Sequence, residues 1–192
     1  MSKLEKIFVN LSARTRNIKT FEHLFSQIDL SNVKKVLEVG CGIGVLSSYL
    51  SEKYEWEVTG IDLDPKQIER AKNDYGENKY LKFLEAAATK LPFEDNEYDL
   101  VLSSDVLHHI VSDWEKALSE ISRVLRPDGF YVLNDLTFPS FSFFKKWSLP
   151  VDDITNYLKR NNFKIIYEKR PKSTIFGNRF SIISQKHPTN YY

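Results

Sequence analysis

The chain has 192 residues, 42% of them hydrophobic and 28% charged, as expected for a globular domain with one core. Its 27 basic and 26 acidic side chains give a formal charge of +1, which argues against nucleic acid or an anionic membrane surface as a partner. A single cysteine excludes an internal disulfide, and the sequence shows neither a signal-peptide core nor an apolar run that could span a membrane. We therefore expect a cytoplasmic protein without membrane insertion.

The expected elements alternate between helical and extended segments along most of the chain. Residues 1–32 are expected to form a helical cap, with helices at about 2–10 and 17–29. From residue 33 onward, apolar runs rich in β-branched residues alternate with helical periodicity, which is typical of crossovers that build a parallel sheet. The predicted strands cover 34–40, 57–62, 80–85, 98–103, 129–136, 163–170 and 179–186. The predicted helices cover 44–54, 65–75 with Asp64 as N-cap and Pro65 at the first position, 113–125 and 151–161.

The last two predicted strands are joined by the short segment RPKSTIFGN, which contains no helix. A parallel crossover needs about a dozen residues or more, so these strands should pair antiparallel. The predicted fold class is α/β: a Rossmann-like three-layer sandwich with a seven-stranded, mostly parallel sheet and an antiparallel last strand as its reversed edge. A single domain is expected over 1–192, with a cofactor-binding core at 33–136 and a substrate-side segment with the C-terminal strands at 137–192.

Three glycines stand where the first predicted strand passes into a helix, in VLEVGCGIG at 36–44. Because glycine has no Cβ, a ligand can approach the backbone amides of this turn; a tight turn without a ligand is the alternative. The dinucleotide fingerprint G-x-G-x-x-G fails because Val45 or Ser47 replaces its last glycine, and no Gly-Lys-Ser/Thr of a Walker loop follows. At the end of the next strand, Asp62 is placed to accept hydrogen bonds from both hydroxyls of a ribose.

Four segments in register, VLEVGCGIG, GIDLDP, LPFEDNEYDLVLSSDVLHHI and ISRVLRPDGFYVL, resemble the motifs of class I S-adenosylmethionine-dependent methyltransferases. The resemblance covers about residues 33–136 and implies S-adenosyl-L-methionine as the cofactor, with no metal. It implies that the glycine loop faces the methionine end, that Glu38 helps to position that end, that Asp62 holds the ribose and that Leu63 packs on the adenine. The cofactor-binding residues predicted on this basis are Glu38, Gly40, Cys41, Gly42, Gly44, Asp62, Leu63, Ala87, Ala88 and Ser104.

The adenine side of the predicted site departs from the family pattern. Family members often carry Gly-Asp-Ala before Lys-Leu-Pro-Phe, and the aspartate accepts a hydrogen bond from the adenine amine. This chain has Ala86-Ala87-Ala88-Thr89 there, so the Ala87 side chain cannot accept that bond, although the backbone of Ala88 can still meet the ring. Losing one such hydrogen bond typically costs about 0.5–1.5 kcal/mol, so cofactor binding is expected to survive.

The end of the fourth strand carries the candidates for chemistry. The Asp/Asn-Pro-Pro-aromatic turn of many methyltransferases that act on nucleic acids or proteins is replaced by Ser104-Asp105-Val106-Leu107, and no Pro-Cys nucleophile is present. Asp105 and His109 are predicted as catalytic residues, because a histidine there could take a proton from the acceptor. The alternative is that His108 and His109 only pack or cap a short helix.

The spacing of Asp105 and His109 also resembles that of phosphobase N-methyltransferases, where a histidine four residues after an aspartate lies near the substrate. In those enzymes a tyrosine of the N-terminal helix partners the histidine, but no tyrosine precedes Tyr49 in this chain. A phosphobase acceptor is therefore not expected.

Two further segments are candidates for contact with the acceptor, TFPSFSFFKKW at 137–147 and SARTRNIK at 12–19, with core packing and a solvated turn as the alternatives. The predicted function is in-line transfer of the methyl group of S-adenosylmethionine to a small-molecule acceptor. The alternatives are a non-catalytic S-adenosylmethionine-binding subunit, a methyltransferase acting on a macromolecule and a nucleotide-dependent oxidoreductase. The acceptor, the methylated atom and the oligomeric state stay open.

Overall fold

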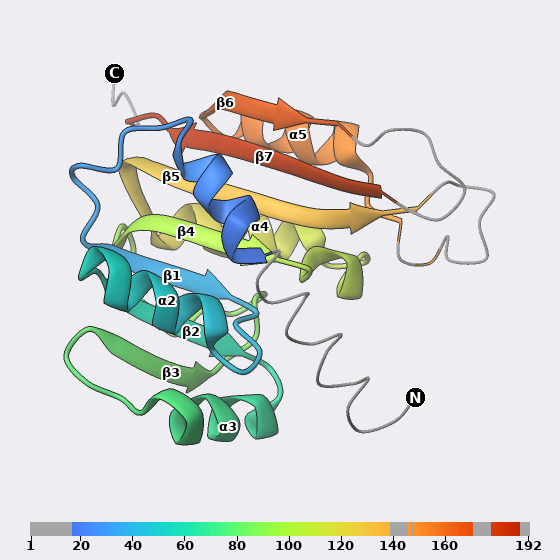
Figure 1. The fold of residues 1–192 in the computed structure, drawn as a ribbon. Coiled ribbons are helices and arrows are strands. Elements are labelled where there is room, and N and C mark those ends of the chain that lie inside the picture. Colours follow the sequence, from blue (N-terminus) through green and yellow to red (C-terminus); the bar gives the residue numbers. More distant parts are fainter. Residues whose placement is uncertain (1–16, 139–145, 147, 171–177, 189–192) are drawn as a thin grey trace.

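The computed structural model describes residues 17–138, 146, 148–170 and 178–188 (Figure 1). The predicted helix at 2–10, most of the aromatic segment at 137–147 and most of the basic segment at 12–19 lie outside these residues. In the described part of the chain, no helix is long and apolar enough to cross a membrane.

A central sheet is flanked by helices on both faces (Figure 1). Its strands are β1 (Lys35–Val39), β2 (Glu57–Asp62), β3 (Leu81–Glu85), β4 (Tyr98–Ser104), β5 (Leu125–Thr137), β6 (Phe163–Lys169) and β7 (Asn178–Lys186). The helices are an N-terminal one at 17–25, α2 (Val45–Tyr54), α3 (Pro65–Tyr75), the short 3-10 helix η1 (Leu107–His109), α4 (Trp114–Val124) and α5 (Val151–Arg160). Pro65 opens α3 behind the Asp64 cap, whose side chain accepts from the Lys66 N–H, as predicted.

The sheet has seven strands in the order β3-β2-β1-β4-β5-β7-β6, and β7 is the strand that runs against its neighbours. The mostly parallel sheet with an antiparallel last strand is therefore confirmed. The expectation that the reversed strand forms the edge is wrong, because β7 lies between β5 and β6. The crossover through α5 places β6 two positions beyond β5, and β7 then pairs with both strands and satisfies its backbone groups on both sides.

Among the described residues, two element boundaries differ from the prediction by more than one residue. β5 begins at Leu125 rather than at residue 129, because Leu125 pairs with Tyr98 of β4 before an irregularity in the register shifts the pairing to Leu100 and Phe130. The N-terminal helix ends at residue 25, where its backbone passes into a turn, and not at the predicted residue 29. Both differences arise at element ends, where local periodicity carries the least information.

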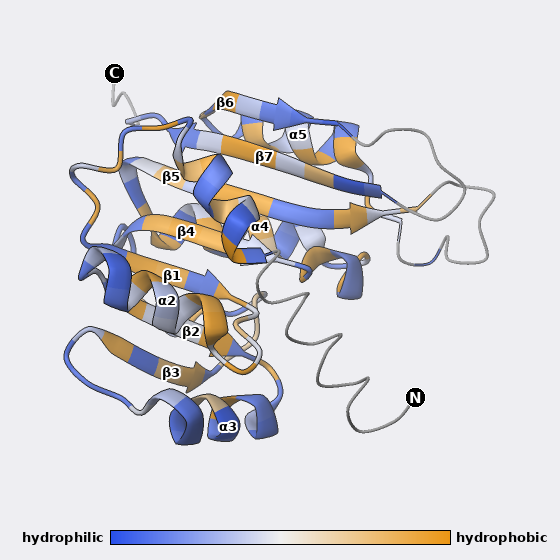
Figure 2. Ribbon diagram, viewed as in Figure 1, coloured by the Kyte–Doolittle hydropathy of each residue, from blue (hydrophilic) through white to orange (hydrophobic). Residues whose placement is uncertain are grey.

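Two apolar layers hold the helices on the sheet, and Figure 2 shows hydrophobic residues along the strands and hydrophilic ones on the outer sides of the helices. One layer packs α4 and α5 against the sheet through residues such as Ile121 and Leu158. The other packs the helix at 17–25, α2 and α3 through residues such as Phe21, Leu50 and Ala71. Both faces of the central strands are covered, which explains their almost continuous apolar sequence.

The strand order reverses between β1 and β4, because the chain builds β2 and β3 on one side of β1 and β5 on the other side of β4. In open α/β sheets, crossovers that leave in opposite directions open a crevice at the carboxyl ends of the two strands. The topology thus fixes where a ligand site is expected.

A substitution at Gly44 tests how α2 packs on the sheet. It has a φ of 78°, and a Cβ at this position would lie 2.5 Å from Cε1 of Phe83 on β3. Gly44→Ala should lower the free energy of unfolding by about 1–3 kcal/mol, measured by urea denaturation, because the added methyl overpacks a buried ring. Gly76 is the matched control, since its φ is 70° and a Cβ there meets nothing within 4 Å. Equal losses in the two alanine variants would contradict a packing role for Gly44.

Candidate active site

The crevice contains a cavity of about 820 Å³ at the carboxyl ends of β1, β2 and β4. Its lining includes both predicted catalytic residues and the predicted contacts of the adenosine part: Asp62, Leu63, Ala87, Ala88, Asp105 and His109. A second cavity of about 320 Å³ adjoins it and shares Gly40, Gly42 and Asp105 with it. Glu38, Cys41 and Ser104 line this smaller cavity, whereas Gly44 lines neither of the two.

The glycine loop is fixed to the end of β2 by backbone hydrogen bonds. The N–H groups of Gly40 and Cys41 both donate to the Ile61 carbonyl at 2.8 Å. The Gly42 N–H donates to Oδ2 of Asp62 at 2.8 Å, and the Asp64 N–H donates to Oδ1 at 3.0 Å. Each carboxylate oxygen of Asp62 thus holds one backbone donor and keeps lone pairs for a ligand.

Gly42 leaves the backbone bare where a ligand would approach. Its φ is 53°, in the left-handed region that favours glycine, and a Cβ placed there would meet nothing within 4 Å. Because Gly42 lines both cavities, this open space lies at the junction of the two cavities. Gly40 differs, since its Cβ would lie 2.2 Å from Cγ2 of Val106, so its role includes close packing against the segment after β4.

Burial changes the acid–base properties of two side chains in the smaller cavity. Glu38 on β1 is buried and accepts a hydrogen bond from the Ser47 hydroxyl. Desolvation raises the pKa of Glu38 to about 8, against the opposing effect of that hydrogen bond, so near neutral pH the side chain is largely protonated. Burial likewise raises the pKa of the Cys41 thiol, which makes it a poor nucleophile.

Asp105 occupies an uncommon conformation directly after β4. Its φ is 59°, in the left-handed region, which aspartate adopts more readily than most non-glycine residues. Its Oδ2 accepts from Nη2 of Arg179 at 2.8 Å, whereas its Oδ1 is buried and has no hydrogen-bond partner among the described residues.

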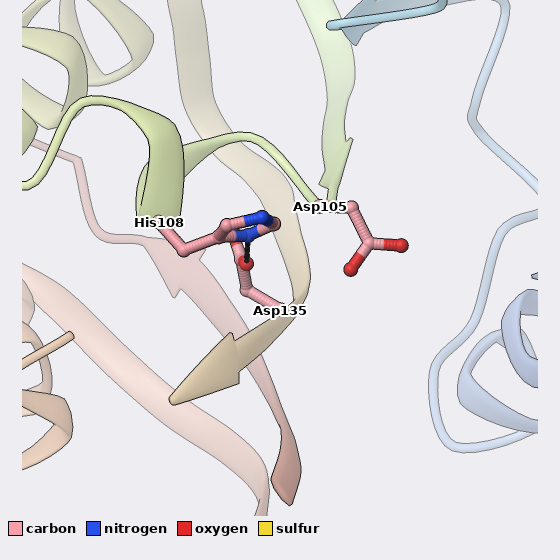
Figure 3. A group of neighbouring side chains, drawn as sticks. All are labelled: Asp105, His108 and Asp135. Carbon is pink, nitrogen blue, oxygen red and sulfur yellow. Dashed lines mark hydrogen bonds and ion pairs between the residues drawn. The ribbon is translucent and has the colours of Figure 1, made fainter. Parts of the chain in front are cut away.

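The two adjacent histidines have different environments. His108 is 8% exposed, and its Nδ1 lies 2.5 Å from Oδ1 of the buried Asp135 on β5 (Figure 3). Oδ2 of Asp135 accepts from the N–H groups of Val106 and Leu107 at 3.1 and 2.8 Å. His109 is exposed and lines the larger cavity, with its ring centroid 4.0 Å from that of His108. Packing, the alternative weighed for both histidines, therefore describes His108, and the catalytic role of His109 stays a prediction.

Asp105, His108 and Asp135 each place a possible ligand atom within 4.8 Å of the others. The oxygens of Asp135 already accept from backbone N–H groups and from His108, and Oδ2 of Asp105 accepts from Arg179. Metal binding would have to break these contacts, so we assign no metal to this group.

Sequence reasoning did not identify several polar residues of the site. The predicted Ser104 is linked by hydrogen bonds to three residues that were not predicted, in a chain that runs from β7 through β5 and β4 to the N-terminal helix. The chain is Ser181–Asn134–Ser104–Asn17, with successive distances of 3.2, 3.3 and 2.9 Å. The polar pair Asn134-Asp135 within the apolar run of β5 was a usable signal. Arg179 offered no such signal, because its partner Asp105 lies 74 residues earlier in the chain.

Comparison with known proteins identifies the family. The family model described as "Methyltransferase domain" matches residues 37–133, which is half of the chain. Phosphoethanolamine N-methyltransferase 3 of Arabidopsis thaliana is 27% identical over 164 residues, covering 85% of this chain and 32% of that protein. The chloroplastic tocopherol O-methyltransferase of Arabidopsis thaliana is 41% identical over 105 residues, covering 53% of this chain and 30% of that protein. The chain thus spans about a third of the length of these two relatives.

Among solved structures, phosphoethanolamine N-methyltransferase 2 of Haemonchus contortus in complex with S-adenosyl-L-methionine aligns with a TM-score of 0.75 and 16% identity. The alignment covers 88% of this chain and 52% of that one, and at this identity it shows a shared fold. With the family match, the chain belongs to the class I S-adenosylmethionine-dependent methyltransferases. The geometry fits the cofactor of this family, since a carboxylate with spare lone pairs ends β2 and Gly42 leaves its backbone open.

Asp62 provides the first test of cofactor binding. Asp62→Ala should weaken the binding of S-adenosylhomocysteine roughly 10- to 100-fold, because a charge-assisted hydrogen bond is worth about 1.5–3 kcal/mol. Isothermal titration calorimetry measures the affinity, and circular dichroism confirms that the variant remains folded. An unchanged affinity in the folded variant would rule out a cofactor contact for Asp62.

The raised pKa of Glu38 predicts that the stability of the ligand-free protein depends on pH. The unfolded side chain loses its proton near pH 4.5, whereas the folded one keeps it up to about pH 8. Between these values the folded state binds more protons, so the free energy of unfolding should fall as the pH rises. Glu38→Gln lacks this titration, so the stability of the wild type relative to this variant should decline from about pH 5 to pH 8 in urea unfolding. Parallel profiles would contradict a raised pKa.

Proposed function

We propose that this protein transfers the methyl group of S-adenosylmethionine to a small-molecule acceptor bound in the larger cavity. The observation that carries the proposal is the meeting of the glycine loop, Asp62, Asp105 and His109 at one crevice. Residues suited to hold a nucleoside thus line the same cavity as a carboxylate and an imidazole that can act on an acceptor.

The cofactor is assigned to residues on both sides of Gly42. Asp62 binds the ribose hydroxyls, and the exposed Leu63 and the backbone of Ala88 flank the adenine. Glu38 and the glycine loop hold the methionine end in the smaller cavity. The bound cofactor supplies a methyl group activated by its sulfonium.

The protein's own contribution is to position the acceptor and to receive a proton. Holding two reactants in the attack geometry accounts for a large part of the rate enhancement of such reactions. His109 faces the larger cavity and takes the proton that the acceptor loses on methylation. Asp105, at the junction of the two cavities, orients the acceptor relative to the methyl group.

Three observations support a small acceptor. A volume of about 820 Å³ lies within the range of roughly 300–1,000 Å³ typical of small-molecule sites. The two relatives named above carry the names of small acceptors, one methylated on nitrogen and one on oxygen. The formal charge of +1 provides no general attraction for a polyanion. The two names point to different atoms, so they support the size class of the acceptor and not the methylated atom.

Methyl-labelled S-adenosylmethionine, incubated with the protein and a fractionated metabolite extract, tests this function. We expect label in a low-molecular-weight fraction together with an equal amount of S-adenosylhomocysteine. His109→Ala should lower kcat about 10²- to 10⁴-fold and leave the affinity for S-adenosylhomocysteine unchanged, because a proton acceptor acts in the transition state. The exposed His187, which lines neither cavity, provides the control variant His187→Ala.

Other outcomes distinguish the alternatives. Label in protein or nucleic acid would indicate a macromolecular acceptor. Cofactor binding without turnover in any fraction would indicate a non-catalytic subunit. An activity loss in His109→Ala that follows a lowered melting temperature would show that this histidine is structural.

A further inference from the structure

The larger cavity is acidic along its described lining. Asp62, Asp64 and Asp105 line it, and no lysine or arginine does so among the described residues. Asp62 accepts from two backbone N–H groups and Asp64 caps α3, so both are engaged close to the end of β2. Asp105 follows β4, on the other side of β1 from these two. A cavity lined by one sign of charge favours a ligand of the opposite sign, here a cation.

The Asp105 carboxylate has unused acceptor capacity. Its Oδ2 accepts from Nη2 of Arg179 at 2.8 Å, and its Oδ1 has no hydrogen-bond partner in the described part of the chain. Two carboxylate oxygens offer about four acceptor sites, so one described bond leaves most of them open. The Asp105 side chain is 34% exposed and lines both cavities, whereas Arg179 lines only the smaller one. A donor group at the junction of the two cavities can therefore reach the exposed side of this carboxylate.

The charge that develops during methyl transfer distinguishes nitrogen from oxygen as the attacking atom. A hydroxyl group loses its proton to become a strong nucleophile, and the negative charge that develops on its oxygen is repelled by a nearby carboxylate. A nitrogen atom that attacks the methyl group gains positive charge, which the same carboxylate stabilises. An ammonium also gives the carboxylate a charge-assisted hydrogen bond, the stronger kind. A carboxylate at the junction, such as Asp105, thus favours attack by nitrogen.

We propose that the methyl acceptor is an amine, that its nitrogen is the methylated atom and that Asp105 binds this nitrogen through an N–H group. The inference rests on the proposed function and narrows its acceptor to one chemical class. The amine binds as an ammonium, and one of its protons passes to His109, which lines the same cavity. The freed lone pair forms the N–C bond, and the electron pair of the broken S–C bond stays on sulfur. The products are a methylated ammonium and S-adenosylhomocysteine, with one proton left on His109.

Two stable isotopes measure the attachment of the methyl group directly. The protein is incubated with S-adenosylmethionine labelled with ¹³C in its methyl group and with a metabolite extract labelled throughout with ¹⁵N. We expect the methyl carbon of the product to show a one-bond coupling to ¹⁵N in its NMR spectrum, because the new bond joins the two labelled atoms. A methylated small molecule without this coupling would overturn the inference and leave the proposed function intact. The absence of any methylated small molecule would contradict the proposed function itself.

Asp105→Asn tests the residue assigned to the amine. Asparagine tolerates the left-handed backbone at this position, so the change removes the charge and keeps the shape of the side chain. The acceptor is the extract fraction that yields the labelled product. With this acceptor, kcat/KM should fall roughly 10- to 100-fold, because a charge-assisted hydrogen bond to the acceptor is weakened. The affinity for S-adenosylhomocysteine, measured by calorimetry, should stay unchanged, since the carboxylate is assigned to the acceptor and not to the donor.

The matched control is Asp74→Asn, because Asp74 also pairs with an arginine, Arg70, at 3.3 Å but lines neither cavity. This variant should match the wild type in both measurements. Wild-type kcat/KM in Asp105→Asn would overturn the role of Asp105. A weaker affinity of that variant for S-adenosylhomocysteine with an unchanged KM for the acceptor would also overturn it, because the carboxylate would then act on the donor.

Discussion

The site depends on the reversal of strand order between β1 and β4. The chain extends the sheet from β1 toward β3 and from β4 toward β6, and such a switch leaves a crevice at the carboxyl ends of the two central strands. The segments that follow β1, β2 and β4 end at this crevice, although they are far apart in sequence. The hydrogen bond from the Gly42 N–H to Asp62 fixes the first two segments to each other. The site is therefore built on rigid strand ends, as accurate positioning of reactants requires.

Polar residues at these strand ends are buried, and most of them satisfy one another. Asp135 is fully buried and accepts from three backbone N–H groups and from His108. Asn134 and Ser104 take part in the chain of hydrogen bonds that reaches the N-terminal helix. Asp105 differs from them, because it combines a left-handed backbone with a carboxylate oxygen that lacks a described partner. A carboxylate oxygen without a described partner therefore belongs to a residue at the junction of the two cavities.

Local sequence patterns predicted the elements and the part of the site that belongs to a single loop or strand end. The glycine loop, Asp62 and the capped start of α3 are short-range features, because turn geometry and capping involve neighbouring residues. The place of β7 inside the sheet depends on which strand pairs with which, and periodicity carries no information on that order. Arg179 reaches Asp105 only because β7 lies beside β5, so this contact could not be predicted before the sheet order was known.

The two histidines show how a buried group can determine the position of an exposed one. Asp135 binds the Val106 and Leu107 N–H groups and the His108 ring, and so holds both the start and the first histidine of the η1 turn. In a tight helical turn, consecutive side chains point in clearly different directions, so the burial of His108 directs its neighbour outward. His109 therefore reaches the larger cavity through a carboxylate on β5, a strand on which no site residue was predicted. The orientation of His109 therefore depends on Asp135 of β5 as well as on the η1 turn.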